Sequence, residues 1–175
     1  LAKALGPSAV ELVAGDLVFT QISPNDREVF LNNIFKILKP GGFFVSRVKL
    51  HNPFWRSVSP YDIVHDLYER GESLTKFTLH RFGDKVLNEK NFSFRVNDFL
   101  PLFTEAFNVS RDTEEGELIL SSMDYFKKID GNVVRSCFPK TYFNSWISER
   151  FDIVKISHAG DYPESDFFPI YALRK

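Results

Sequence analysis

A strand–helix–strand pattern in the first fifty residues constrains the fold more than any other feature of the chain. Residues 9–15 (AVELVAG) form an apolar run that stops at Gly-Asp, as a buried strand does where it meets a functional loop. Apolar residues then recur at helical spacing over 30–38, and the run Phe43 to Val48 predicts a second strand after a glycine pair. Because a strand, a helix and a strand follow in this order, we expect a right-handed parallel crossover and an α/β fold.

The rest of the chain predicts a long helical stretch followed by two strands. Between residues 54 and 150 helical patterns succeed one another, interrupted by glycines and a proline. Strand character returns at 152–158 and 167–173, and the polar turn between them predicts an antiparallel pair. We therefore predict a single domain over residues 1–175, with a strand–helix–strand core at 1–53, a helical insertion or cap at 54–150 and a strand pair at 151–175.

Composition excludes several classes of partner. The chain has 22 basic and 23 acidic residues, for a net charge of −1, so it lacks the positive field that nucleic acid or an anionic membrane would need. Its single Cys137 excludes an internal disulfide, and its histidines and cysteine show no spacing typical of metal ligands. No apolar run approaches the roughly 18 residues of a membrane span. We expect a cytoplasmic protein that binds a small molecule, without a metal.

The first fifty residues contain, in order, the run AVELVAGD, the loop LVFTQISPND, the helix REVFLNNIFKIL, the turn Leu38-Lys39-Pro40-Gly41-Gly42 and the strand FFVSRV. This series resembles the back half of class I, Rossmann-like S-adenosylmethionine-dependent methyltransferases. In that family the strand equivalent to residues 9–15 ends at the methyl-transfer site, and two antiparallel strands close the sheet. The resemblance implies transfer of a methyl group from S-adenosylmethionine to a small or medium-sized acceptor, a reaction in which positioning supplies most of the acceleration.

Two elements of the family have no counterpart in this chain. They are the glycine-rich loop that approaches the cofactor and the acidic residue that holds its ribose, and both would precede Leu1. We expect the chain to be the C-terminal portion of a longer protein and to bind S-adenosylmethionine weakly, if at all. The alternative is a noncatalytic, methyltransferase-like domain that acts in protein–protein interaction. An edge strand at residues 9–15 would be unpaired, which predicts a homodimer through this edge or a helix packed over it.

The loop after the first strand carries the residues that the resemblance places beside the cofactor: Gly15, Asp16 and Leu17. Asp16 could orient the acceptor or take its proton as a general base, and it could equally cap the loop backbone. Gly15 could let a ligand approach the backbone, and an ordinary turn glycine would look the same.

Five further residues are candidates for binding the acceptor. Gln21 could donate to a carbonyl, or it is a solvated loop amide. Arg47 lies within the second strand, so it needs a partner: a carboxylate of the acceptor or one of the protein. His51 and Trp55 follow that strand and could wall the pocket or pack in the connection. Tyr162, in the turn of the last strand pair, could reach the site or belong only to the turn.

Overall fold

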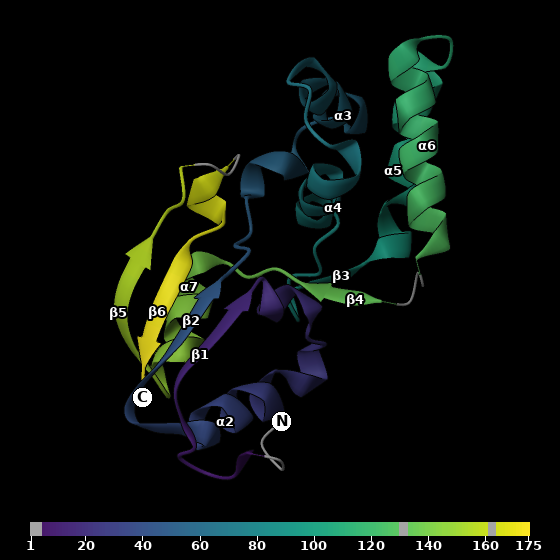
Figure 1. The fold of residues 1–175 in the computed structure, drawn as a ribbon. Coiled ribbons are helices and arrows are strands. Elements are labelled where there is room, and N and C mark those ends of the chain that lie inside the picture. The colour runs from purple at the N-terminus through teal and green to yellow at the C-terminus, as the bar shows by residue number, and fades with distance from the viewer. Residues whose placement is uncertain (1–4, 130–132, 161–163) are drawn as a thin grey trace. The chain divides into compact units, whose positions relative to one another are not determined.

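The chain is divided into two compact units. The computed structural model describes residues 5–129, 133–160 and 164–175 (Figure 1). The sheet unit comprises Leu1–His51 and Ser136–Lys175, and the helical unit comprises Asn52–Arg135. Within the described residues, every helix is too short or too polar to cross a membrane.

A four-stranded sheet forms the centre of the sheet unit, and its strands follow the order β1-β2-β6-β5 (Figure 1). β1 and β2 are parallel, whereas β6 runs antiparallel to both β2 and β5. The fold is therefore mixed α/β, as the sequence predicts. The bounds are β1 (Val10–Asp16), β2 (Leu38–Arg47), β5 (Asp152–Ser157) and β6 (Ile170–Arg174).

The turn between the helix and the second strand is built differently from the expectation. The helix ends at Ile37, and β2 already begins at Leu38, which pairs with Val10 of β1. Gly41 has a φ of +76°, a backbone conformation that favours glycine. Its N–H donates to the carbonyl of Lys175 at 3.0 Å, and the Lys175 N–H donates to Gly42 at 2.9 Å. The C-terminal residue therefore holds the glycine pair in place.

Helices α2 (Arg27–Ile37) and α7 (Lys140–Ser148) cover one face of the sheet, which we call the covered face. Phe30 of α2 packs against Phe44 of β2, and Phe143 of α7 packs edge-on against Tyr171 of β6 with ring centroids 4.9 Å apart. Phe19 contacts both Phe44 and Phe143. Sequence patterning places residues 140–148 in the helical stretch, but α7 belongs to the sheet unit.

The opposite face of the sheet, which we call the open face, is more exposed. Leu12 and Phe43 are register partners on this face and remain 59% and 38% exposed. Val45 and Ile170, further along the strands, are half-buried. The two faces of one sheet therefore differ in their access to solvent.

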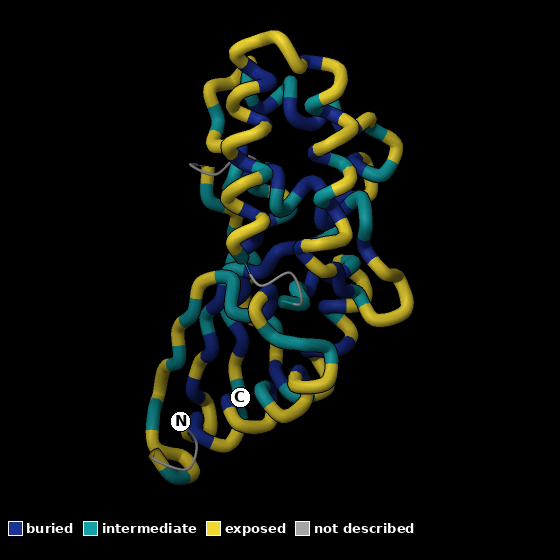
Figure 2. The backbone as a smooth tube through the Cα atoms, turned by 90° about the vertical axis from the view of Figure 1, so that its right-hand side faces the viewer, coloured by how far each residue is buried: buried dark blue, intermediate teal, exposed yellow. Residues whose placement is uncertain are grey.

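Within the described residues of the helical unit there are four α-helices, and buried and exposed residues alternate along them (Figure 2). Phenylalanines from different helices pack at its centre: the ring centroids of Phe82 and Phe103 are 5.0 Å apart, and those of Phe99 and Phe126 are 5.3 Å apart. The chain also forms a short two-stranded sheet from β3 and β4. The bounds are α3 (Pro60–Glu69), α4 (Leu74–Lys85), β3 (Ser93–Arg95), α5 (Leu100–Ser110), α6 (Glu114–Lys128) and β4 (Val134–Ser136).

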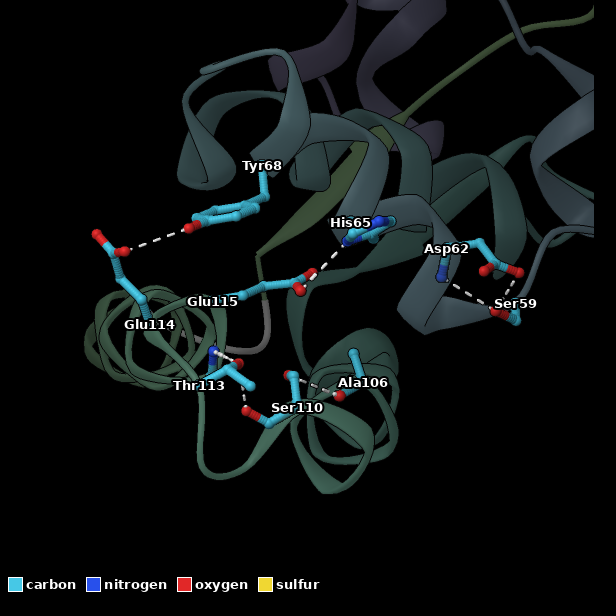
Figure 3. Close-up of polar contacts among 10 residues, drawn as sticks. Ser59, Asp62, His65, Tyr68, Ala106, Ser110, Thr113, Glu114 and Glu115 are labelled. Carbon is cyan, nitrogen blue, oxygen red and sulfur yellow. Dashed lines mark hydrogen bonds and ion pairs between the residues drawn. The ribbon is translucent and has the colours of Figure 1, made fainter.

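Polar contacts secure the turn between α5 and α6 (Figure 3). The Thr113 hydroxyl accepts from the N–H of Gly116 at 3.2 Å and donates to the carbonyl of Ser110 at 2.7 Å. The buried carboxylate of Glu115 lies 3.3 Å from Nδ1 of His65 on α3. A carboxylate in the first turn of a helix also interacts favourably with the helix dipole. These polar side chains therefore hold the helices of this unit together.

Candidate functional site

A shallow hollow of about 400 Å³ lies on the open face, at the carboxyl ends of β1 and β2. Open α/β sheets bind their ligands at this end of the parallel strands. Apolar side chains form most of the lining, and one acid and one guanidinium flank them. The lining residues are Ala14, Gly15, Asp16, Val45, Arg47 and Ile170.

Asp16 and Arg47, both proposed from the sequence, meet in this hollow. They are register partners at the ends of β1 and β2, so their side chains point to the same face. Nε of Arg47 lies 3.3 Å from Oδ1 of Asp16. The side chain of Asp16 is 71% exposed, whereas that of Arg47 is only 23% exposed. The ion pair therefore joins a fixed cation to a carboxylate that is largely in water.

The backbone on either side of Asp16 is restricted by packing. A Cβ atom on Gly15 would lie 2.5 Å from Cγ1 of Val18, so any other residue here would force that side chain to move, whether or not a ligand approaches. Leu17 adopts a left-handed conformation with a φ of 51°, which is uncommon for a residue other than glycine. Its N–H donates to the carbonyl of Arg47 at 3.1 Å. The loop after β1 is thus tied to the end of β2.

The remaining predicted residues are not in the lining of the hollow. Gln21 is exposed at the end of a short 3₁₀ helix, Val18–Gln21. The backbone N–H of His51 donates to the carbonyl of Phe138. Trp55 belongs to the helical unit, where it is 7% exposed. Tyr162 lies outside the described residues.

Trp55 has a packing role within its own unit. The guanidinium carbon of Arg81 lies 4.1 Å from the centroid of the Trp55 ring, and Phe54 packs edge-on against the same ring. A buried cation over an indole is a favourable arrangement. Of the two alternatives that the sequence left open for Trp55, packing is the one for which contacts are observed.

Lys49 is a buried cation near the end of β2 that the sequence reasoning overlooked. It is only 2% exposed, and its ammonium donates to the carbonyl of Leu50 at 2.6 Å and lies 5.3 Å from the ring centroid of Phe168. The chain stays extended beyond β2, since the N–H groups of Val48 and Leu50 donate in turn to the carbonyls of Pro169 and Phe167. Lys49 therefore projects to the same face as Arg47, and the two-residue spacing in the sequence already indicated this.

A second buried cation, Arg27, serves the fold. It donates to Oγ of Ser136 at 2.8 Å and lies 4.5 Å from the ring centroid of Phe138. Burial lowers the pKa of Arg27 from its usual value. The contact anchors the start of α2 to the residue where the chain re-enters the sheet unit.

An apolar hollow of about 450 Å³ follows the outer edge of β1. β1 is an edge strand of the sheet, and α2 forms the other side of the hollow. Its lining residues are Leu5, Val10, Leu12, Val13, Phe30, Asn33, Ile34 and Ile37.

Comparison with known proteins gives structural matches only. No protein-family model matches the chain, and neither does any curated protein. A structure described as a putative zinc-dependent alcohol dehydrogenase from Rhodobacter sphaeroides matches all of this chain and 62% of its own, with a TM-score of 0.54 and 13% identity. An S-adenosylmethionine-dependent methyltransferase from Methanosarcina mazei matches 97% of this chain and 60% of its own, with a TM-score of 0.47 and 14% identity.

Only the match to the putative alcohol dehydrogenase is close enough to bear on the fold, and it shows no reaction. The first match establishes a shared fold at an identity too low to transfer an activity. Other matching structures include a phosphoethanolamine N-methyltransferase from Haemonchus contortus, at 10% identity and a TM-score of 0.31. This chain spans about three fifths of the length of the first two proteins. These matches therefore do not show the activity of a longer protein that contains this chain.

Proposed function

We propose that this chain is the C-terminal, acceptor-side part of a Rossmann-like S-adenosylmethionine-dependent methyltransferase that methylates a small or medium-sized acceptor. The observation that carries the proposal is the hollow formed by Asp16 and Arg47 at the carboxyl ends of β1 and β2. The same strands and the turn between them carry the sequence resemblance to this class. The glycine-rich loop that grips the cofactor would belong to another part of the complete protein.

The lining of the hollow is chemically suited to the reacting end of S-adenosylmethionine. The exposed carboxylate of Asp16 would favour a cationic group, and Ala14, Val45 and Ile170 offer an apolar floor for its neighbouring carbons. When bound, the cofactor supplies an activated methyl group. Asp16 would then orient the acceptor or take its proton, while the ordered loop around Leu17 fixes the distance between the reactants.

Calorimetry with S-adenosylmethionine tests the proposal directly. It would be run on this chain and on the longest reading frame that contains it. We expect tight binding by the longer chain and weak or undetectable binding by this one. Failure of both to bind would refute the cofactor assignment.

The role of Asp16 can be tested in the complete enzyme once an acceptor is known. We expect Asp16→Asn to lower kcat by about 10²–10⁴-fold if the carboxylate is a general base, and by less if it only orients the acceptor. Asp152→Asn is the matched control, because Asp152 also pairs with an arginine on this sheet but lies outside the hollow. Equal activities of the two variants would exclude a catalytic carboxylate at position 16.

The second candidate function is a noncatalytic interaction domain that dimerises through β1. The apolar hollow beside this edge strand favours it, because an edge with exposed apolar side chains pairs readily with another strand. We expect a dimer by light scattering and a monomer for Leu12→Lys. Val29→Lys, at an equally exposed apolar residue of α2 away from this lining, should remain dimeric. A monomeric wild-type chain would rule this function out.

A further inference from the structure

We propose that Arg135 and Tyr125 form a site in the helical unit that binds the phosphate or carboxylate group of a small molecule. Arg135 is the middle residue of β4, and Tyr125 lies near the end of α6. Both residues belong to the helical unit, whereas the hollow of Asp16 and Arg47 belongs to the sheet unit. The inference therefore goes beyond the proposed function and does not depend on it.

Arg135 is a half-buried cation whose side chain has no partner among the described residues. Its Nε atom is buried without a hydrogen-bond acceptor. In the part of the chain that the structure describes, no carboxylate forms an ion pair with its guanidinium, and no other group accepts a hydrogen bond from it. Arg56 also has a buried Nε without a partner, but its terminal nitrogens donate to Glu89 and to the carbonyl of Leu87. Arg135 lacks such compensation.

A guanidinium in this position favours an anion from solution. Burial lowers the pKa of Arg135 from its usual value, because the cation has lost part of its water. An arginine nevertheless stays charged at neutral pH, so the charge and its buried N–H group are left to be compensated. A bound carboxylate or phosphate would supply the acceptor oxygens, and a guanidinium can bind two of them at once.

Tyr125 adds a hydroxyl donor and an accessible ring. Its hydroxyl group acts electrostatically on Arg135 and forms no hydrogen bond with a described residue. The residue is 52% exposed, and its ring packs edge-on against Phe126 with the centroids 5.3 Å apart. The hydroxyl can donate to an oxygen of the anion, and the ring can contact the apolar body that carries it. Lys127 and Lys128 add positive charge at this end of α6.

The test is a binding titration of this chain, followed by NMR at constant ionic strength, with three probes of similar size. Phenyl phosphate and benzoate carry the anion, and benzyl alcohol is neutral. We expect the preferred anion to bind at least about tenfold more tightly than benzyl alcohol, because charge-assisted hydrogen bonds to a guanidinium are strong. The two anions together show whether phosphate or carboxylate is preferred. Equal affinity for all three probes would overturn the proposal.

Variants assign the binding to these two residues. Arg135→Gln should weaken binding of the preferred anion at least about tenfold, and Tyr125→Phe should weaken it several-fold. Lys128→Gln is the matched control, since it removes an exposed cation from the end of α6. It should change the affinity by less than about twofold, because solvent and salt screen an exposed charge. Equal losses in Arg135→Gln and Lys128→Gln would show attraction by net charge alone and would refute the site.

Urea unfolding separates a binding arginine from a structural one. Without ligand, Arg135→Gln should unfold at the same urea concentration as the wild type or at a higher one, because it removes a cation that has no partner. The preferred anion should raise the unfolding midpoint of the wild type and leave that of Arg135→Gln unchanged, since a ligand stabilises only a protein that binds it. A lower midpoint for the ligand-free variant would mean that Arg135 serves the fold and would overturn the proposal.

Discussion

The covered and open faces of the sheet are made from alternate residues of the same strands, yet they serve different purposes. Phe44 and Tyr171 on the covered face are 1% and 0% exposed and contact aromatic rings from both helices. Phe43, the neighbour of Phe44, points to the open face and is 38% exposed. The packing that stabilises the fold is therefore concentrated on the covered face, whereas the open face leaves the ion pair of Asp16 and Arg47 accessible to solvent.

The largest effect should come from removing an aromatic ring on the covered face. Phe44→Ala should lower the free energy of unfolding by about 3–5 kcal/mol, since it creates a cavity among packed rings. Phe43→Ala, one residue away, should cost less than about 1 kcal/mol, because its ring is already partly in water. Urea unfolding of the two variants measures both. Equal losses would break the distinction between the faces.

The second effect is a loss of stability at high pH that arises from Tyr171. Burial raises the pKa of Tyr171 to about 12, above the ordinary value of 10.0. The folded protein therefore holds this proton more tightly than the unfolded chain. Stability from this source is fully present below pH 10 and falls as the pH rises toward 12, by on the order of 2 kcal/mol.

Tyr171→Phe isolates this contribution. The variant loses the hydrogen bond to Oδ1 of Asn144, 2.7 Å long, at a cost of about 1 kcal/mol. It should also lose part of the decline in stability between pH 10 and 12. Unfolding curves at several pH values give the comparison, and identical slopes for both proteins would contradict the burial of this hydroxyl.

A smaller effect is expected at the end of β1, where this strand meets its loop. Gly15→Ala should destabilise the chain by about 1–2 kcal/mol, because the added methyl group overlaps Cγ1 of Val18. Val18→Ala in the same chain should restore part of the loss. Thermal unfolding of the single and double variants forms a double-mutant cycle. Additive losses would show that the two side chains do not compete for space.

The smallest effect on stability should come from the ion pair itself. Asp16→Asn should change the free energy of unfolding by less than about 1 kcal/mol, since the carboxylate is mostly exposed. The change should shrink further at high salt. A larger loss would mean that the open face also contributes to stability and would erase the contrast with the covered face.

Part of the fold and of the site could be predicted from the sequence. The apolar runs at 9–15 and 43–48, with a helical pattern between them, correctly predict the parallel pair of β1 and β2. Asp16 and Arg47 end these strands, so their proximity follows from the parallel register. Lys49 was equally predictable, because two residues of extended chain return a side chain to the same face.

Other features depend on contacts that local patterns do not encode. The start of β2 at Leu38 is stabilised by pairing with Val10 and by Lys175 at the far end of the chain, whereas the local glycines indicate only a turn. The apolar stripe of α7 shows that one side of the helix is buried. It does not show that α7 packs on the sheet, where the ring of Phe143 contacts that of Tyr171 on β6.

The chain leaves the sheet unit and re-enters it at adjoining positions, so the helical unit is inserted at a single point of the sheet unit. Leu50 forms a parallel bridge with Phe138, and the N–H of His51 donates to Phe138 at 2.8 Å. The two ends of the helical unit thus emerge where the sheet unit already brings its backbone together. A short turn in place of residues 52–135 would close a much smaller loop at lower entropic cost. Circular dichroism of such a shortened chain should show a folded sheet, and evolution could exchange the whole helical unit at this junction without rebuilding the strands.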